Sequence, residues 1–270
     1  MKIVRFIDSK GEQRYGERID AQRARVLQGD LFGRFEVTGE TARVEKLLAP
    51  VTPWAILCIG LNYRRHAEEG GAKIPEYPVL FIKSPGALQN PGDPIVLPAV
   101  EPVEVDYECE IAVVIGKKAK NVPREEALSH VLGYTCANDV SGRSWQIQKG
   151  GSQWCRGKSF DTFCPLGPVL VTTDEIPNPN ALKIRTLLNG QVMQDWTTSD
   201  MIFDVPALVS FLSQGTTLAP GTVVLTGTPQ GVGFVRKPPV YLRHGDKVAV
   251  EIEKIGLLEN PVEAEKIVGN

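Results

Sequence analysis

Hydrophobic residues in this chain gather in short runs that are separated by turns rich in glycine and proline. Runs of this length, bounded by turn residues, predict β-strands. The first two strands are expected at 2–7 and 11–19, and the others at 54–60, 79–82, 94–97, 105–115, 132–138, 168–172, 182–188, 191–196, 222–226 and 247–253. Asn189-Gly190 lies between two of these runs and predicts a two-residue hairpin, because both residue types tolerate positive φ.

Helical patterns are fewer and shorter than the strand-like runs. Helices are predicted over Thr41–Leu48, Pro123–His130 and Val205–Gln214, with two shorter ones after Asn62 and Ser141. The third begins behind Asp204, a residue type that caps helix N-termini, and stops at Gly215. Strands with helices interspersed irregularly indicate a strand-rich α+β fold rather than a regular alternation of strand and helix.

The chain is expected to divide near residue 51, because Pro50 and Pro53 bracket a predicted linker. We expect a small N-terminal α+β domain over 1–51 and a main domain over 52–270. The 270 residues suffice for one large domain or for a main domain with a small appendage. They can bury a core without disulfides.

Composition narrows the class of partner and the compartment. Lysine and arginine number 30 against 32 aspartates and glutamates, a net charge of −2, so neither nucleic acid nor a membrane surface is expected as a partner. The apolar runs at 55–60 and 111–116 are too short to span a bilayer, and charges at Lys2, Arg5 and Asp8 interrupt any signal-peptide core. Five cysteines without a CxxC pair suit a reducing compartment, so a cytoplasmic protein is expected.

The segment 105–116 alternates acidic with other residues and then becomes wholly apolar. In a strand, Asp106, Glu108 and Glu110 share one face, with successive carboxylates about 6.6 Å apart along the backbone. Such carboxylates repel one another when partly buried, so either their pKa values rise or a cation lies among them. Asp139, which ends GYTCAND, is the candidate third ligand. All-oxygen ligands favour Mg²⁺, Mn²⁺ or Ca²⁺; a charged edge strand or pairing with lysine and arginine is the alternative.

A candidate acid–base pair lies in the short helix expected after Asn62. His66 and Glu69 are three residues apart and share a helical face. A carboxylate beside an imidazole raises its basicity and fixes its tautomer, as a general base requires. A surface helix with an incidental histidine and glutamate is the alternative. The other two histidines suit structural positions, His130 at a helix C-terminus and His244 in a polar turn.

Several further polar residues are uninformative when each is taken alone. The run VVLTGTPQGVG leads from a strand into a glycine-rich loop that lacks the spacing of a Walker A or dinucleotide-binding motif. Thr228 in that loop either presents a hydroxyl to a carboxylate or belongs to a plain turn. Lys158 in RGKSFDTF either polarises a substrate carbonyl or extends its charge to solvent.

Six segments occur in the order IGLNYRRHAEE, PVLFIKSPGAL, DYECEIAVVIG, GYTCANDVSGRSWQ, GKSFDTFCPLGP and VLTGTPQGVG. Taken together, they resemble the motif series of the fumarylacetoacetate hydrolase family. The resemblance covers about Pro53 to Val262, and the ordered series is specific although each motif is modest. The segment 234–256 looks most like the branch that includes mitochondrial proteins associated with oxaloacetate tautomerisation.

The resemblance implies a mixed β-sandwich roll as the catalytic domain. It also implies a homodimer and one divalent cation, Mg²⁺ or Mn²⁺, with Ca²⁺ as a substitute. The family's metal carboxylates fall on Glu108, Glu110 and Asp139, and its catalytic dyad falls on His66 and Glu69.

The remaining functional positions of the family also have counterparts in this chain. They are a catalytic lysine at Lys158 and substrate-binding groups at Arg143, Gln146, Thr228 and Lys83. Asp106 is not a usual ligand in the similar proteins, and we expect it to lie behind the metal ligands.

The resemblance implies small 2-oxo acids as substrates, such as acylpyruvates and oxaloacetate. The first hypothesis is hydrolytic C–C cleavage of an acylpyruvate. In it, His66 and Glu69 activate a water, Lys158 supports the oxyanion, and a metal-stabilised enolate leaves. The second is keto–enol tautomerisation of oxaloacetate, or decarboxylation or isomerisation, at the same metal site without an attacking water. The third is a non-catalytic carboxylate-binding protein, against which the intact dyad and three carboxylates argue.

Overall fold

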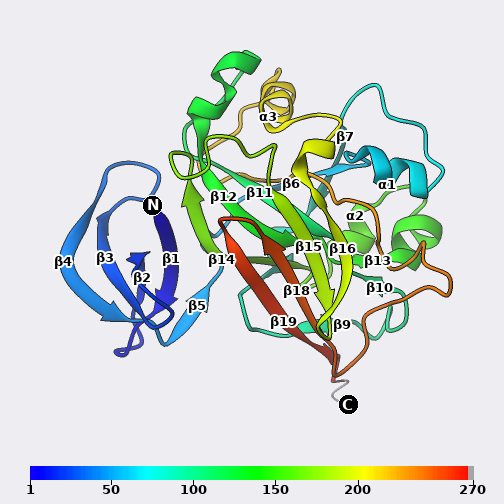
Figure 1. Ribbon diagram of the computed structural model, residues 1–270, viewed down its shortest axis with the longest axis horizontal. Coiled ribbons are helices and arrows are strands. Elements are labelled where there is room, and N and C mark those ends of the chain that lie inside the picture. The colour runs from blue at the N-terminus through cyan, green and yellow to red at the C-terminus, as the bar shows by residue number, and fades with distance from the viewer. Residues whose placement is uncertain (267–270) are drawn as a thin grey trace.

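The N-terminal part consists of strands that curl together at the left of Figure 1, coloured blue. The structure is a computed structural model and describes residues 1–266. The first five strands are β1 (Lys2–Ile7), β2 (Gln13–Arg18), β3 (Arg23–Gly29), β4 (Phe35–Arg43) and β5 (Lys46–Leu48).

The helix predicted over Thr41–Leu48 is wrong, and residues 1–51, all of them described, contain no helix. The end of β4 pairs with β3, with Thr41 opposite Arg25, and β5 pairs with β1, with Leu48 opposite Arg5. A β-bulge at Arg25/Leu27 shifts the register in this hairpin. Pairing with neighbouring strands therefore overrides a weak local helical pattern.

One large sheet carries both the N-terminal strands and most of the main part. Its order is β4-β3-β2-β1-β14-β12-β11-β17-β6-β7, with β5 on β1 and β8 on β14. The strands not yet placed are β6 (Ile56–Gly60), β7 (Val79–Lys83), β8 (Leu88–Gln89), β11 (Cys109–Ile115), β12 (Val131–Asn138), β14 (Cys164–Thr172) and β17 (Val223–Leu225). Because β1 pairs with β14, hydrogen bonds cross from residues 1–51 into the rest. The division at 51/52 stays a prediction.

A second sheet, ordered β16-β15-β18-β19-β9, packs against the first through contacts of β11 and β12 with β15 and β18. Its strands are β9 (Ile95–Leu97), β15 (Lys183–Leu188), β16 (Gln191–Thr197), β18 (Lys247–Ile252) and β19 (Gly256–Ala264). A short ladder joins β10 (Val105–Asp106) to β13 (Ser141–Gly142). The predicted hairpin is confirmed, because Asn189 and Gly190 turn between β15 and β16 with φ of 52° and 81°.

Helices are short and lie at the edges of the sheets (Figure 1). They are α1 (Arg64–Glu69), α2 (Cys155–Lys158), α3 (Val205–Ser213), three 3₁₀ turns (Pro85–Ala87, Arg124–His130 and Thr198–Asp200) and a π-helix (Ser144–Lys149). The predicted cap of α3 is confirmed, because Asp204 accepts a hydrogen bond from the Ala207 N–H at 2.9 Å. None of the helices within residues 1–266 has the length and apolarity that crossing a bilayer requires. The strand-rich α+β fold class is confirmed.

Strand alternation in β11 determines where the acidic side chains lie. Cys109, Ile111 and Val113 belong to one of the two core clusters. Ala112 and Val114 face the opposite cluster. Glu108 and Glu110 share the parity of this second set, so their side chains lie on the same face of this segment as Ala112 and Val114. Both side chains are nonetheless buried.

Candidate active site

A cavity of about 150 Å³ lies beside the acidic end of β11, bordered by segments from five parts of the chain. Its polar lining includes His66, Glu108, Glu110, Lys158 and Thr228, and its apolar lining includes Ile59, Phe81, Trp154 and Phe234. These residues come from strands, from the loops that follow them and from the short helices α1 and α2, so a rigid sheet holds part of the site in place.

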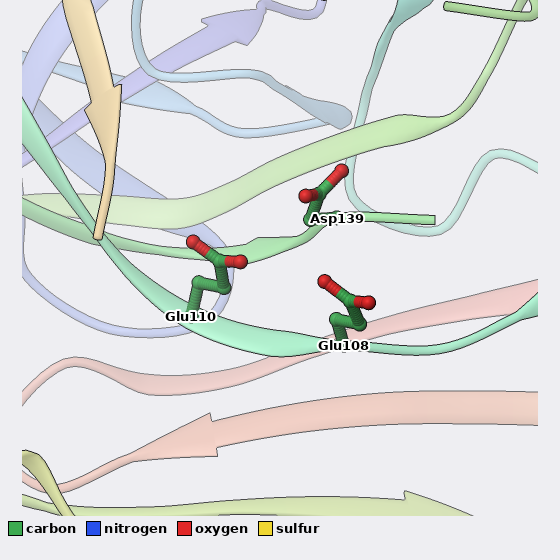
Figure 2. A group of neighbouring side chains, drawn as sticks. All are labelled: Glu108, Glu110 and Asp139. Atoms are coloured by element: carbon green, nitrogen blue, oxygen red, sulfur yellow. The ribbon is translucent and has the colours of Figure 1, made fainter. Parts of the chain in front are cut away.

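Three carboxylates converge at this cavity (Figure 2). Glu108 and Glu110 project to the same side of their strand segment, toward Asp139, which directly follows the adjacent β12. The backbone fixes this arrangement, because the Asp139 N–H donates to the Glu108 carbonyl oxygen at 2.9 Å. One oxygen from each of the three carboxylates lies within 4.8 Å of the others. The sequence placed these residues together, and the structure does so as well.

Buried cations partner two of these carboxylates. Lys158 Nζ lies 2.9 Å from Glu108 Oε2 and 2.7 Å from Asp139 Oδ2. Lys83 Nζ lies 2.6 Å from Asp139 Oδ1, and Arg143 Nη2 lies 2.7 Å from Glu108 Oε1. Glu108 and Asp139 are thus each held by two cationic side chains.

Glu110 has no such partner among the described residues. Its Oε2 accepts a hydrogen bond from the Gly227 N–H at 2.6 Å. Burial, together with the negative charges of Asp139 and Glu108, raises the pKa of Glu110 well above its ordinary value. Burial also opposes ionisation of Glu108, but the charges of Lys158 and Arg143 outweigh it and lower that pKa to about 2.

The charges around the cavity leave one carboxylate uncompensated. Four fully or nearly buried carboxylates, those of Asp106, Glu108, Glu110 and Asp139, face three buried cations, Lys83, Lys158 and Arg143. An excess negative charge in a buried cluster of carboxylate oxygens is an environment that favours a divalent cation with oxygen ligands. The residues present therefore fit such a cation, with Glu108, Glu110 and Asp139 as its ligands.

The predicted His–Glu pair is formed within α1. His66 Nδ1 and Glu69 Oε1 are 2.8 Å apart. Glu69 also accepts a hydrogen bond from the Gly231 N–H, at 2.9 and 3.1 Å from its two oxygens. Because Nδ1 faces a carboxylate, the proton of a neutral imidazole resides on Nδ1 and leaves Nε2 as a free acceptor. His66 lines the cavity, so this pair can exchange a proton with a bound molecule.

Asn62 precedes α1, as the sequence predicts, but does not cap it. Tyr63 is the N-cap residue, with no side-chain cap. The Asn62 amide instead ties three segments together, because it donates to the carbonyls of Phe203 and Thr226 and accepts from the Phe203 N–H.

Four other residues predicted to act at the site lie in different settings. Gln146 and Thr228 line the cavity, and Thr228 Oγ1 accepts a hydrogen bond from the amide of Gln194 at 2.8 Å. Arg143 also lines it but gives most of its donors to protein carboxylates. Lys83 is not among the lining residues, and its Nζ contacts Asp139 and the Val140 carbonyl instead. Lys83 therefore lies beside a metal-ligand candidate and outside the cavity lining, and a substrate-binding role for it stays a prediction.

Sequence reasoning missed the aromatic part of the cavity. Phe81, Trp154 and Phe234 all line it, and the Phe81 and Trp154 rings pack edge to face with centroids 5.5 Å apart. Phe81 could have been found from the alternation of β7, in which it shares its buried face with Lys83. No local pattern identifies Trp154 or Phe234.

Comparison with known protein families covers almost the whole chain. The family model described as the C-terminal domain of fumarylacetoacetate (FAA) hydrolase matches residues 55–263. A second model, described as Rv2993c-like, N-terminal, matches residues 1–50.

The individual proteins that are similar in sequence or structure include enzymes named as tautomerases, an isomerase and a hydrolase. The mitochondrial oxaloacetate tautomerase fahd2 of Xenopus laevis is 52% identical over 217 residues, which is 80% of this chain and 68% of that protein. The human mitochondrial oxaloacetate tautomerase FAHD2A is 46% identical over 90% of this chain and 74% of its own length. Among solved structures, a 5-carboxymethyl-2-hydroxymuconate Δ-isomerase from Mycobacterium smegmatis has a TM-score of 0.85 at 38% identity, covering 98% of this chain and 100% of that one. A fumarylacetoacetate hydrolase from Exiguobacterium antarcticum has a TM-score of 0.84 at 38% identity with the same coverage. The matched domain, these relatives and the shared fold together show that the chain belongs to the fumarylacetoacetate hydrolase family.

Proposed function

We propose that this chain is a divalent-cation-dependent enzyme that converts a small 2-oxo acid through its enolate, and that its reaction is the keto–enol tautomerisation of oxaloacetate. The observation that carries the proposal is one small cavity that joins a buried carboxylate cluster with an excess negative charge to a hydrogen-bonded His–Glu pair. The names of the two oxaloacetate tautomerases, at 46% and 52% identity, support this reaction over the others that the family includes.

The size of the cavity supports a small substrate. Its volume of about 150 Å³ is below the roughly 300–1,000 Å³ of sites for drug-sized ligands. A four-carbon dicarboxylic acid suits a site of this size, which is polar on the side of Glu108 and Lys158 and apolar on the side of Phe81 and Trp154.

Glu108, Glu110 and Asp139 are the residues that would hold Mg²⁺ or Mn²⁺, with Ca²⁺ as a substitute. When bound, the cation would polarise the 2-oxo carbonyl and stabilise the negative charge of the enolate. Lys158 keeps two of its three N–H donors on Glu108 and Asp139, which leaves one for a substrate oxygen. Burial opposes the charge on Lys158, but Asp139 and Glu108 outweigh that effect and raise its pKa, so it stays a cationic donor.

His66 is the proton-transfer group of the proposed reaction. With Nδ1–H donated to Glu69, its Nε2 can remove the proton from the carbon between the oxaloacetate carbonyl and the distal carboxylate. Returning a proton to the enolate oxygen completes the enol, and the reverse sequence restores the keto form. Such a positioned base contributes roughly 10²–10⁴-fold to the rate. Gln146 and Thr228, which line the cavity, would donate hydrogen bonds to the substrate carboxylates.

Hydrolytic C–C cleavage of an acylpyruvate, the first hypothesis from the sequence, is the second candidate. It is favoured by the same free Nε2, which can deprotonate a water as well as a carbon acid, and by the similarity to the fumarylacetoacetate hydrolase of Exiguobacterium antarcticum. A non-catalytic role has no support from the named relatives.

One experiment separates the two reactions. The purified protein with Mg²⁺ is given oxaloacetate, and the interconversion of its enol and keto forms is followed by ultraviolet absorbance, while acetylpyruvate loss is measured in parallel. We expect faster tautomerisation than in buffer and no acetylpyruvate cleavage. Cleavage without accelerated tautomerisation would establish the hydrolase instead. His66→Ala, which keeps the three carboxylates, is the control for non-enzymatic catalysis by the metal.

We also propose that the protein is a homodimer that buries the edge strand β7. Leu80 and Ile82 are 49% and 52% exposed on this strand, which ends the large sheet and offers unpaired backbone groups. Light scattering after size exclusion tests this, and Ile82→Lys is expected to yield a monomer.

A cytoplasmic location also stays a proposal. Four of the five cysteines are buried as free thiols, which suits a reducing compartment. The word mitochondrial in the relatives' names describes those proteins. Imaging of the tagged full chain in its own cell tests the location.

A further inference from the structure

Asp106 is the most heavily hydrogen-bonded side chain near the cavity, although it does not line it. It is fully buried, and its two oxygens accept five hydrogen bonds. Three come from the backbone N–H groups of Tyr107, Gly233 and Phe234, at 2.8–3.0 Å. A carboxylate offers about four lone-pair sites, so Asp106 has no capacity left for a metal ion.

The backbone bonds connect Asp106 to the His–Glu pair. Gly233 and Phe234 belong to the turn that begins at Gly231, and the Gly231 N–H donates to Glu69. Tyr107, the neighbour of Asp106, donates its hydroxyl to the Gly231 carbonyl at 3.3 Å. Only glycine permits this approach, because a Cβ at residue 233 would lie 2.5 Å from Asp106 Oδ1.

The remaining bonds connect Asp106 to the substrate side of the cavity. Arg143 donates Nε and Nη2 to Asp106 Oδ2, at 2.9 and 2.7 Å, and its guanidinium stacks on the Phe234 ring at 4.3 Å. Its Nη1 donates to Gln146 Oε1 at 2.8 Å. With its oxygen occupied, Gln146 presents the donor end of its amide to the cavity that it lines.

Arg143 itself has little capacity to bind substrate. Nη2 also contacts Glu108, so four of its five N–H donors are used within the protein. A bidentate grip on a substrate carboxylate, the usual role of an active-site arginine, is closed to it. Its hydrogen bonds instead link Asp106 to Gln146, and we call this link the relay from Asp106 to Gln146.

We propose that Asp106 is a positioning residue that holds two cavity walls in register: the Gly231–Phe234 turn, which orients Glu69 and His66, and Arg143, which orients Gln146. The assignment rests on the proposed function only for its kinetic readout. A misplacement of reacting groups by about 1 Å costs on the order of 10²-fold in rate, so Asp106 should matter although it touches no substrate.

The test substitution is Asp106→Asn, which keeps the size of the side chain but turns a donor toward other donors. We expect kcat/KM for oxaloacetate to fall by about 10²-fold, with a lower kcat as well as a higher KM, because both walls are disturbed. Oxalate affinity, measured calorimetrically with Mg²⁺, is expected to fall by about 10-fold or more. Amide hydrogen exchange at Gly231, Gly233 and Phe234 is expected to accelerate.

Asp8→Asn is a matched control far from the cavity. Asp8 is also buried, accepts from two backbone N–H groups and pairs with an arginine, Arg14. The Asp8→Asn protein should be less thermally stable than the wild type, with unchanged oxalate affinity and kcat/KM. Equal kinetic and binding losses in both variants would show that Asp106 acts only through global stability and would overturn the proposal.

Arg143→Lys separates the two walls and serves if Asp106→Asn does not fold. It breaks the relay to Gln146 but leaves the bonds of Asp106 to Gly233 and Phe234. We expect weaker oxalate binding with unchanged exchange protection of the turn; unchanged oxalate binding would overturn the relay. A wild-type protein inactive on oxaloacetate and acetylpyruvate would refute the proposed function, while oxalate affinity and amide exchange would still decide the role of Asp106.

Discussion

Replacing Glu110 by glutamine should stabilise the metal-free protein while weakening its binding of a divalent cation. Glu110 is the member of the carboxylate cluster without a cationic partner among the described residues, and burial with two carboxylate neighbours raises its pKa. A folded state that raises the pKa of an acid is destabilised above the unfolded pKa, because the unfolded chain releases its proton more readily. Glutamine keeps the size and an acceptor for the Gly227 N–H but removes the charge.

The structure sets the scale of this effect. Two unit charges 4.8 Å apart repel by about 3.5 kcal/mol at an effective dielectric constant of about 20, and Glu110 has two such neighbours, partly offset by Lys158. The destabilisation has a ceiling at pH 7, because the folded protein can protonate Glu110 instead. That ceiling is about 3 kcal/mol, since each pH unit above the ordinary value of 4.5 costs about 1.4 kcal/mol. We therefore expect Glu110→Gln to raise the free energy of unfolding of the metal-free protein at pH 7 by about 1–3 kcal/mol, which corresponds to several degrees in melting temperature.

Glu108→Gln is the matched control, with the opposite sign. Its pKa of about 2 lies below 4.5, so the ionised form stabilises the fold by roughly 3 kcal/mol above pH 4.5. Glutamine there leaves Lys158 and Arg143 short of a partner, and the metal-free protein should lose stability.

Calorimetric unfolding with EDTA and with excess Mg²⁺ provides the assay. In EDTA at pH 7, Glu110→Gln should have the highest melting temperature, the wild type the next, and Glu108→Gln the lowest. Mg²⁺ at 100 times its Kd for the wild type should add about 2.7 kcal/mol to the free energy of unfolding of the wild type. The same Mg²⁺ concentration should add less to either variant. The gain of Glu110→Gln should vanish near pH 4.5, where the unfolded glutamate is also half protonated. A Glu110→Gln protein that melts below the wild type in EDTA would refute the charge imbalance.

Three further predictions follow from the same geometry. His66→Ala should lower kcat by about 10²–10⁴-fold and leave Mg²⁺ affinity unchanged, whereas Glu68→Gln, on the exposed side of α1, should alter neither; a His66→Ala enzyme with full activity would exclude the dyad. EDTA should abolish activity, and added Mg²⁺ or Mn²⁺ should restore it; activity that persists after exhaustive chelation would exclude a metal-dependent reaction. Gly227→Ala should lower the melting temperature, because Gly227 has φ +98° and a Cβ there would lie 2.8 Å from the Asn62 Cβ; an unchanged unfolding curve would mean that the loop relaxes freely.

Alternation within a strand is the feature of this sequence that predicts its chemistry best. Glu108 and Glu110 lie on one face because side chains in a strand repeat every two residues, and no tertiary information is needed for that. The contact of His66 with Glu69 is predicted equally well by helical spacing. Asp139 is predicted as a third metal ligand only because it lies at the end of a predicted strand and because the family resemblance places a ligand there.

Contacts between segments that are distant in the sequence could not be predicted from local sequence patterns. The position of Lys83 behind Asp139 depends on how β7 lies beside the loop after β12, 56 residues farther along the chain. The bonds from Asp106 to Gly233 and Phe234 span more than 120 residues. The helix predicted over 41–48 is wrong for the same reason, because this marginal pattern forms the end of β4 and β5 only when β3 and β1 are there to pair with it.

The arrangement of cations around the carboxylates explains how such a cluster can fold before a metal binds. Three unpartnered carboxylates this close would take up protons or move apart. Lys158, Lys83 and Arg143 keep Glu108 and Asp139 in place, and they leave the single unbalanced charge on Glu110. A divalent cation would then meet ligands that are already positioned, and we expect the charge of Glu110 to contribute most to its binding. The melting order of the two glutamine variants measures this division of roles directly, because it compares a carboxylate that the fold pairs with cationic side chains with one that it leaves without a cationic partner among the described residues.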